Sequence, residues 1–311
     1  MQKDNFKVSV IVPILNEEGN IEILTERVLA VIERYWDYEL LFIDDGSTDN
    51  TLKIIQEEMK KNDKIRYLSF SRNFGHQNAL RAGFDYATGD CVISIDGDLQ
   101  HPPELIPKLL EKWQQGYDIV YTIRQEDPQR PFLKRKASNI FYNIMNRFSD
   151  VRINEGGADF RLIDRNVVEV IKRINENNLF MRGMISWLGF KQCGIEYMPE
   201  RRHWGKTKYT FKKMNKFALD GITSFSIKPL RISTIFGYTA AFLAFLYGVY
   251  AILIKIFTNT AVSGWASLLA GLLFIGGVQM IMIGILGEYV GRLFIESKKR
   301  PNYIIKEKSN D

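Results

Sequence analysis

The stretch that decides the fold is Cys91-Val-Ile-Ser-Ile-Asp-Gly-Asp-Leu-Gln-His-Pro-Pro103. It begins with a short apolar run, typical of a buried strand, and the carboxylates of Asp96 and Asp98 follow at once. Two carboxylates held close together repel unless a cation lies between them. A hard divalent ion such as Mg²⁺ or Mn²⁺ relieves that repulsion and keeps coordination positions for phosphate oxygens. An Asp-x-Asp pair alone is weak evidence, but in this setting it predicts a metal and phosphate site.

Outward from this stretch, apolar runs alternate with helical periodicity. Strands are predicted over Val8–Val12, Glu39–Ile43, Ile65–Phe70, Cys91–Ile95 and Asp118–Ile123. Helical spacing lies between them, at Leu52, Ile55 and Met59, and again at Ile106, Leu109, Leu110 and Trp113. This alternation predicts an α/β fold with a parallel sheet covered by helices. In such sheets ligands bind beyond the carboxyl ends of the strands.

Acidic residues collect at those predicted strand ends. The first strand ends in VPILNEEGN (12–20) and the second in FIDDGSTDNT (42–51). The acidic residues at this edge are Glu17, Asp44, Asp45, Asp96 and Asp98. Any one of them could serve solubility alone, and Asp at a helix start is often only a cap.

Two long uncharged runs stand near the carboxyl end. Ile232–Ile254 has 23 residues without a charge and Ser263–Gly287 has 25. Each exceeds the ~20 apolar residues that a helix needs to cross a bilayer. A pair of buried core helices is the alternative, but two such runs in tandem favour a membrane anchor.

The charges around these runs predict their orientation. Asp4 and Lys7 lie where a signal peptide would need an apolar region, so the first 230 residues are expected to stay where they are made. Basic residues flank both runs on the outside, and the connecting loop carries only Lys255. The positive-inside rule then puts both termini in the cytoplasm. A lysine-rich amphipathic helix is predicted at the membrane interface over Tyr209 to about Ser224.

We therefore expect four parts: a cytoplasmic catalytic domain (1–205), an amphipathic juxtamembrane segment (206–230), a two-helix transmembrane hairpin (231–289) and a basic tail (290–311). The net charge of +6 gathers at the membrane flanks, which fits anionic headgroups better than nucleic acid. Cys91 and Cys193 have no close spacing and give no metal or redox signature.

Taken together, the motifs resemble the inverting family-2 glycosyltransferases with a GT-A fold, a Rossmann-like nucleotide-diphospho-sugar transferase domain. More closely, the chain resembles polyprenyl-phosphate glycosyltransferases, namely bactoprenol glucosyltransferases and dolichol-phosphate mannose synthases. The resemblance covers essentially the whole chain. It rests on VSVIVPILNEE, DDGSTDNT, SRNFGHQNALRAGFDYATGD, DGDLQHPPELIPKL, GGADFRLIDR, FALDGITSFSIKPLR and GEYVGRLFIESKKRP. The two C-terminal spans place it nearer the bacterial glucosyltransferase-like branch.

The resemblance implies roles for several residues on the donor side. The nucleoside would be held by Pro13, Asn16 and Glu17, with Asp44 near the base. Asp96 would lie beside the nucleotide and the metal, Asp98 would ligate the metal, and Gln100 would be a further ligand. Arg202 and Lys208 belong to a family stretch (202–208) that closes over the diphosphate, and a solvated charge run is the alternative for Lys206 within it.

On the acceptor side, the resemblance makes Asp159 an active-site aspartate that acts with Asp98 in catalysis. A turn residue after Gly156-Gly157 is the alternative for Asp159, and Arg161 and Asp164 could be merely paired surface charges. The positions that bind lipid phosphate in the family correspond to Arg124 and Arg135, and Ser138 lies one turn beyond Arg135. Forked guanidinium donors suit phosphate oxygens.

The implied reaction is inverting, metal-dependent transfer of one sugar, with glucose from a UDP-sugar favoured, to undecaprenyl or another polyprenyl phosphate. It would take place at the cytoplasmic face of the plasma (inner) membrane of a bacterium, for cell-envelope glycosylation. UDP-N-acetylglucosamine, GDP-mannose and UDP-aminoarabinose stay open as donors, as do a flippase partner and a homo-oligomer. A non-catalytic membrane protein that binds nucleotide-sugar is the alternative of another class. A Rossmann oxidoreductase is disfavoured because Pro13 and Asn16 stand where its glycine fingerprint would be.

Overall fold

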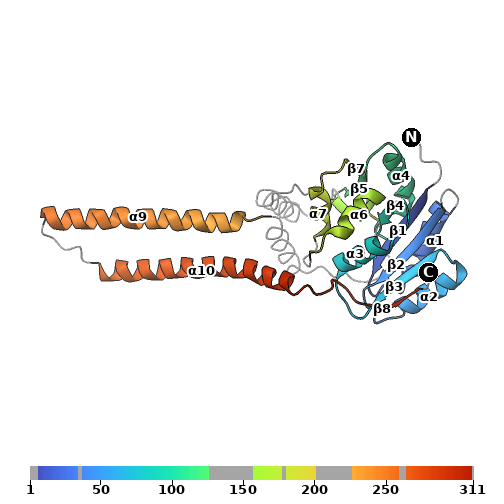
Figure 1. The fold of residues 1–311 in the computed structure, drawn as a ribbon, viewed down its shortest axis with the longest axis horizontal. Coiled ribbons are helices and arrows are strands. Elements are labelled where there is room, and N and C mark those ends of the chain that lie inside the picture. Colours follow the sequence, from blue (N-terminus) through green and yellow to red (C-terminus); the bar gives the residue numbers. More distant parts are fainter. Residues whose placement is uncertain are drawn as a thin grey trace.

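A mixed sheet forms the centre of the domain in this computed structural model (Figure 1). The structure describes residues 6–33, 37–125, 157–176, 180–200, 226–258 and 264–309. Within them the strands are β1 (Lys7–Ile14), β2 (Asp37–Asp44), β3 (Ile65–Phe70), β4 (Cys91–Ser94), β5 (Ile119–Arg124), β6 (Gly157–Asp164), β7 (Gln192–Tyr197) and β8 (Ile305–Lys308). Their order across the sheet is β7-β5-β6-β4-β1-β2-β3-β8.

Four parallel strands, in the order β4-β1-β2-β3, make up the middle of the sheet and correspond to the first four predicted strands. Beyond the predicted parallel strands, the sheet also contains antiparallel pairs. β6 runs antiparallel between β4 and β5, and β8 runs antiparallel beside β3. Neither was predicted as a strand. β6 lacks an apolar run because it carries charged residues, whose burial depends on distant partners. β8 has only four residues, which are mostly exposed, so it shows no buried-strand pattern either.

Helices cover both faces of the sheet and enclose two apolar cores. One core includes residues of α1 (Ile21–Ile32), α2 (Thr51–Lys61) and α4 (Ile106–Gln114). The other includes residues of α3 (His76–Tyr86), α6 (Arg165–Arg173) and α7 (Met181–Trp187). The predicted apolar face of α4 is confirmed, since all four of its residues are buried. Each large apolar side chain removed from water contributes about 1.5–3 kcal/mol.

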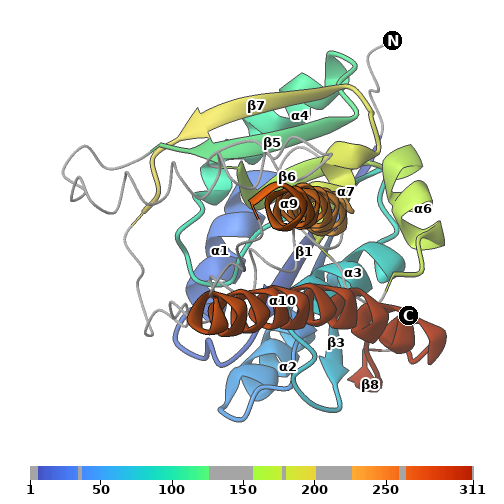
Figure 2. The ribbon, with the colours of Figure 1, turned by 90° about the vertical axis from the view of Figure 1, so that its left-hand side faces the viewer.

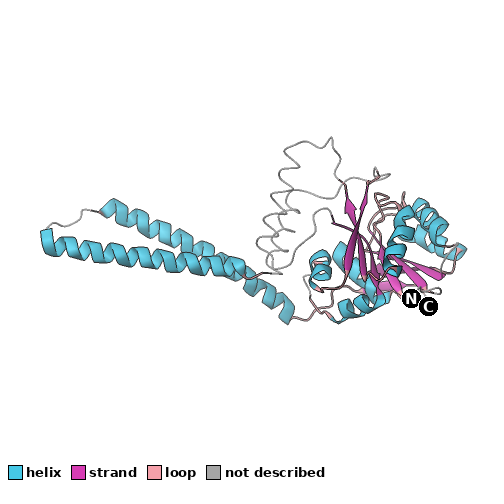
Figure 3. Ribbon diagram, turned by 90° about the horizontal axis from the view of Figure 1, so that it is seen from above, coloured by secondary structure: helices cyan, strands magenta, loops and turns pink. Residues whose placement is uncertain are grey.

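Two long helices extend together from one side of the domain, as Figures 1 and 3 show. They are α9 (Lys228–Thr258) and α10 (Trp265–Ser297), with 31 and 33 residues. Within them, Leu230–Ile254 and Gly271–Ser297 are long and apolar enough to cross a membrane, and their most apolar windows are 0% buried. At 1.5 Å per residue each helix is roughly 45–50 Å long. The predicted interfacial helix from Tyr209 lies outside the described residues.

The chain beyond α10 returns to the domain. β8 pairs with the edge strand β3, with Leu68 opposite Lys308, and Figure 2 shows the two strands side by side. Tyr303 stacks on Phe70 with ring centroids 5.1 Å apart and donates a hydrogen bond to Asp85 over 2.9 Å. The segment that we assigned to a basic tail therefore includes the end of α10 and a strand of the central sheet.

Candidate active site

A tight acidic turn, residues 96–100, follows β4. Gly97 lies against β1, where an added Cβ would meet Ile14 Cγ2 at 2.9 Å, so a larger residue would force the Ile14 side chain or the turn to shift. Leu99 has a φ of 59°, an uncommon value for a side chain of its size. The backbone N–H of Gln100 donates to Asp98 Oδ1 over 3.1 Å. Strained backbone of this kind persists where the surrounding structure holds it, often at functional sites.

Asp96 has an oxygen suited to a cation. Its Oδ1 is buried and has no hydrogen-bond partner among the described residues. Two histidines lie near it: His76, with Nε2 3.5 Å from Oδ1, and His101, with Nδ1 3.6 Å from Oδ2. A buried acceptor without a donor costs free energy, and a divalent ion would remove that cost. Asp96 Oδ1 could therefore bind a cation, and Asp98 and Gln100 stay predicted ligands beside it.

The described residues contain no group of three or more His, Cys, Asp or Glu placed to hold a metal ion. A cation at the acidic turn would thus depend on an amide oxygen and on oxygens from a bound ligand, in addition to the two carboxylates. Mg²⁺ commonly binds in this way, through one or two carboxylates and substrate phosphates.

Asp159 lies in β6 and is only 6% exposed, so the alternative of a turn residue is wrong. Arg182 of α7 binds it with a fork, donating from Nε to Oδ1 over 2.8 Å and from Nη2 to Oδ2 over 2.9 Å. Arg161 Nη2 lies 3.4 Å from Oδ1. The alternative of paired surface charges is also wrong, because Arg161 is buried beside Asp159 and Asp164, also buried, caps α6.

These contacts keep Asp159 ionised. Burial alone would raise its pKa, but the charge of Arg182, the hydrogen bond with His76 and the charge of Arg161 outweigh it and hold the pKa well below the usual range. Burial lowers the pKa of Arg161 to about 10, which still leaves its guanidinium charged at neutral pH. A carboxylate in this state is a poor proton acceptor near pH 7.

His76 joins the two acids, and the sequence reading did not single it out. It is the first residue of α3, after Gly75 with a φ of 100°. Its Nε2 lies 3.5 Å from Asp96 Oδ1 and 3.5 Å from Asp159 Oδ2, and its side chain is 40% exposed. Burial opposes its charge, but its hydrogen bond to Asp159 and the charge of Asp96 raise its pKa on balance. In the sequence, His76 is only one residue of the longer motif over residues 71–90.

The predicted nucleoside residues organise the loops after β1 and β2. Asn16, at a φ of 52°, donates its backbone N–H to Ser47 Oγ over 2.9 Å and accepts from the Thr48 N–H over 2.8 Å. Both oxygens of the buried Asp44 accept hydrogen bonds, from the Ser47 N–H and from Ser69 Oγ. These contacts give Asn16 and Asp44 a structural role, and nucleoside binding stays a prediction.

The same holds for Glu17, which is buried and accepts from Asn20 Nδ2 over 2.6 Å, and for Pro13, which is buried in β1. Arg124 ends β5 and is exposed; Tyr197, at the end of β7, is its register partner. The structure thus brings Asp96 and Asp159 together through His76. Arg135, Ser138, Arg202 and Lys208 lie outside the described residues.

Comparison with known families gives two matches that together span most of the chain. Residues 9–172 match the family described as Glycosyl transferase family 2, and residues 228–293 match the GtrB C-terminal hairpin. The second match coincides with α9 and most of α10.

Several relatives are similar over nearly their whole length. A prophage bactoprenol glucosyl transferase homolog of Escherichia coli is 48% identical, with 96% of this chain and 98% of that protein covered. A bactoprenol glucosyl transferase of Shigella phage SfV is 46% identical, with the same coverage. An uncharacterized glycosyltransferase of Bacillus subtilis, YkcC, is 41% identical, with 97% of this chain and 94% of that protein covered.

Among solved structures, the mannosyltransferase PcManGT from Pyrobaculum calidifontis, in complex with GDP-Man and Mn²⁺, is similar with a TM-score of 0.50. The sequences are 15% identical, and the match covers 72% of this chain but 64% of that one, less than two thirds of its length. At this identity the likeness concerns the fold alone. Together with the family match, it confirms the predicted GT-A fold.

Proposed function

The chain belongs to glycosyl transferase family 2, and from this premise we propose that it transfers one glucose residue from a UDP-sugar to undecaprenyl or another polyprenyl phosphate. The acceptor and the sugar are supported by relatives named bactoprenol glucosyl transferase, similar over 96% of the chain. Membrane association agrees with the two apolar helices and with the hairpin match.

The observation that carries this proposal is the meeting of Asp96 and Asp159 at His76, where the buried Asp96 Oδ1 has an ion-pair contact but no hydrogen-bond partner among the described residues. Asp96, Asp98 and Gln100 would hold a divalent ion, Mg²⁺ or Mn²⁺. When bound, such an ion stabilises the negative charge that develops on a departing nucleoside diphosphate. Arg202 and Lys208 would add positive charge on the same ligand.

Asp159 is proposed to act by its charge and position, not as a base. A phosphate monoester is already anionic at neutral pH, because its second pKa is about 6, so the acceptor needs no strong base. The fork from Arg182 fixes the Asp159 carboxylate in the site. In-line attack of the acceptor on the anomeric carbon would invert its configuration, and a nearby carboxylate stabilises the positive character of that carbon.

The acceptor phosphate is proposed to bind Arg124, Arg135 and Ser138. Arg124 is exposed at the end of β5, at the same edge of the sheet as the acidic turn. A guanidinium group donates two parallel hydrogen bonds to phosphate oxygens, which a single ammonium group does not.

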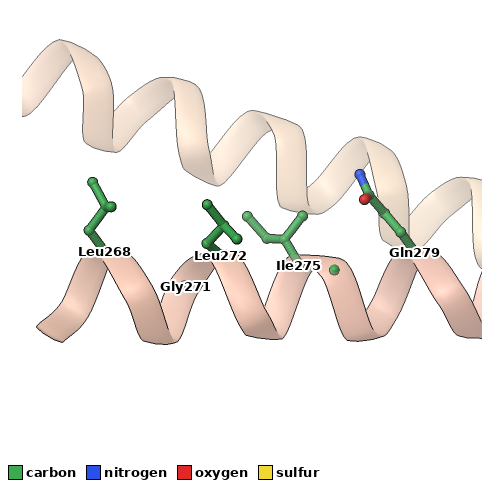
Figure 4. A pocket seen from close by; sticks show the side chains of 6 residues that line it. Leu268, Gly271, Leu272, Ile275 and Gln279 are labelled. Carbon is green, nitrogen blue, oxygen red and sulfur yellow. The ribbon is translucent and has the colours of Figure 1, made fainter. Parts of the chain in front are cut away.

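The two helices are proposed to cross the membrane as a hairpin, with the catalytic domain and both termini in the cytoplasm. The pairing of β8 with β3 supports this orientation, because it places the chain after the second span on the same side as the domain. Figure 4 shows Leu268, Leu272, Ile275 and Gln279 pointing from α10 toward the neighbouring helix, along a groove of ≈ 470 Å³. A glutamine between spans is costly in lipid alone and gains from a partner helix.

A panel of radiolabelled nucleotide-sugars tests the proposal. The purified protein, in membranes containing undecaprenyl phosphate and Mn²⁺, should convert UDP-glucose to labelled lipid and release UDP. The panel also contains UDP-N-acetylglucosamine, GDP-mannose and a UDP-aminoarabinose, and preference for one of these would replace glucose as the sugar. Asp98→Ala serves as the inactive control. Metal-dependent UDP-glucose binding without any UDP release would favour a non-catalytic binding protein and overturn the proposal.

A further inference from the structure

Tyr197 carries a buried hydroxyl that the protein does not use within its described residues. It is the last residue of β7, at the carboxyl edge of the sheet, and is 4% exposed. Its Oη has no hydrogen-bond partner among those residues. The ring is held edge-on against His101, with centroids 5.8 Å apart, and its backbone carbonyl accepts from the Gln125 N–H over 2.9 Å. The ring is therefore fixed, while no described residue satisfies its polar atom.

Tyr197 lies beside residues of the candidate active site. His101, against which the ring packs, also contacts Asp96. Arg124 is the register partner of Tyr197 on β5, so both side chains leave the sheet on the same face. Burial raises the pKa of Tyr197 to about 12, and the charges of Arg124, Asp96 and Asp98 act on the same group. The phenol is thus a neutral hydrogen-bond donor at physiological pH.

An unsatisfied buried hydroxyl costs folding free energy, whereas a phenylalanine would fill the same space without that cost. A ligand oxygen that enters the site and accepts a hydrogen bond from this hydroxyl would remove that cost. The ligand must offer an acceptor and tolerate the guanidinium of Arg124, and anionic phosphate oxygens meet both conditions.

We propose that Tyr197 Oη donates a hydrogen bond to a phosphate oxygen of a bound substrate, between Arg124 and the acidic turn. The inference rests on the proposed function, which supplies two sources of such oxygens. One is the diphosphate of the nucleotide-sugar and the other is the phosphate of the lipid acceptor. Tyr197 would then help to bind substrate and would take no part in proton transfer.

The variant Tyr197→Phe separates this role from a structural one, because the two predict opposite effects on stability. Without ligands, the apparent melting temperature of the full-length protein in detergent should stay the same or rise. Affinity for the phosphate-bearing substrate should fall about tenfold, the usual effect of a lost hydrogen bond to a charged group.

Tyr67→Phe is the matched control. Tyr67 is also buried, but its hydroxyl donates to Glu307 Oε1 over 2.6 Å and accepts from Gln56 Nε2 over 3.2 Å. Loss of these hydrogen bonds should lower the melting temperature and leave substrate affinity unchanged. The two variants remove the same atom from the same residue type.

Two binding measurements by calorimetry distinguish the sources of phosphate. One uses UDP with Mn²⁺ and no lipid, and the other uses a short-chain polyisoprenyl phosphate in detergent. A loss confined to UDP assigns Tyr197 to the diphosphate, and a loss confined to the lipid assigns it to the acceptor. A melting temperature lowered as in Tyr67→Phe, or unchanged affinity for both ligands, would overturn the inference. Neither measurement requires turnover, so a parental protein that transfers no sugar would count against the proposed function alone.

Discussion

Arg182 binds both carboxylate oxygens of Asp159, from Nε to Oδ1 over 2.8 Å and from Nη2 to Oδ2 over 2.9 Å. The two residues come from α7 and β6, so the fork ties a helix on one face of the sheet to the strand that separates β4 from β5. Charged, two-point hydrogen bonding of this kind fixes direction as well as position. The Asp159 carboxylate is therefore both ionised and oriented before any substrate binds.

Substitution of Arg182 should damage both stability and catalysis. Arg182→Met leaves the buried Asp159 carboxylate with weaker partners, and we expect the free energy of unfolding to fall by about 3 kcal/mol. This is at the lower end for a broken buried ion pair, because Arg161 and His76 remain. Arg182→Lys keeps the charge but not the fork, and should still lower kcat/KM about tenfold or more. Thermal unfolding in detergent and the transfer assay measure the two effects.

Lys172→Met is the control for Arg182→Met. Lys172 pairs with an exposed carboxylate, that of Glu169, over 2.9 Å, and such surface pairs contribute about 0–1 kcal/mol. If Arg182→Met unfolded at the same temperature as Lys172→Met, the fork would not be an important source of stability.

The pH dependence of the reaction should show that Asp159 is not the base. Because its pKa is depressed, its ionised contacts contribute fully above the unfolded value of about 3.9 and are lost only as the pH falls toward the folded value. Between pH 5 and 9 it should not titrate. An acid limb near pH 6 or above then belongs to another group, either the acceptor phosphate, whose second pKa is about 6, or His76, whose pKa is raised. Asp159→Asn should be slower but keep that limb, and loss of the limb in the variant would identify Asp159 as the base.

Removal of a carboxylate from the acidic turn should weaken metal binding. In the presence of UDP, Asp98→Asn is expected to raise the Kd for Mn²⁺ at least about tenfold, because a neutral amide attracts a divalent ion less than a carboxylate. Isothermal titration calorimetry measures this directly, and EDTA should abolish turnover until Mn²⁺ is restored. Asp37→Asn is the control, since Asp37 lies at the start of β2, away from the edge of the sheet that carries the acidic turn, and pairs with Lys64. Equal affinity in Asp98→Asn and the parent would exclude the acidic turn as the metal site.

The contact between the C-terminal segment and the sheet should contribute to stability. Tyr303→Ala removes the ring that stacks on Phe70 and the hydrogen bond to Asp85. We expect the free energy of unfolding to fall by about 2–3 kcal/mol, less than for a fully buried aromatic residue. The neighbouring Ile304 is 51% exposed, so Ile304→Ala should cost less than about 1 kcal/mol. Thermal unfolding compares the two variants. Equal melting temperatures would show that Tyr303 does not help to hold the C-terminal segment to the domain.

The sequence was sufficient for features that depend on local pattern. Apolar runs predicted β1 to β5, because a buried strand shows as a short run of consecutive apolar residues. The two candidate membrane spans followed from length and composition alone, since a bilayer has a fixed thickness. The Asp96-Gly97-Asp98 turn could be placed after β4 because it follows the apolar run of that strand directly.

Only the tertiary structure decided which of these elements meet. β6 inserts antiparallel between β4 and β5, and β8 returns from beyond α10 to pair with β3. His76 and Arg182 lie 83 and 23 residues from Asp159 in the chain, and both contact it in the fold. Strand pairing and the burial of charges depend on partners far away in sequence, so a local pattern does not reveal them. The acidic turn could be predicted from the sequence, whereas the ionised and oriented state of Asp159 exists only once the chain has folded.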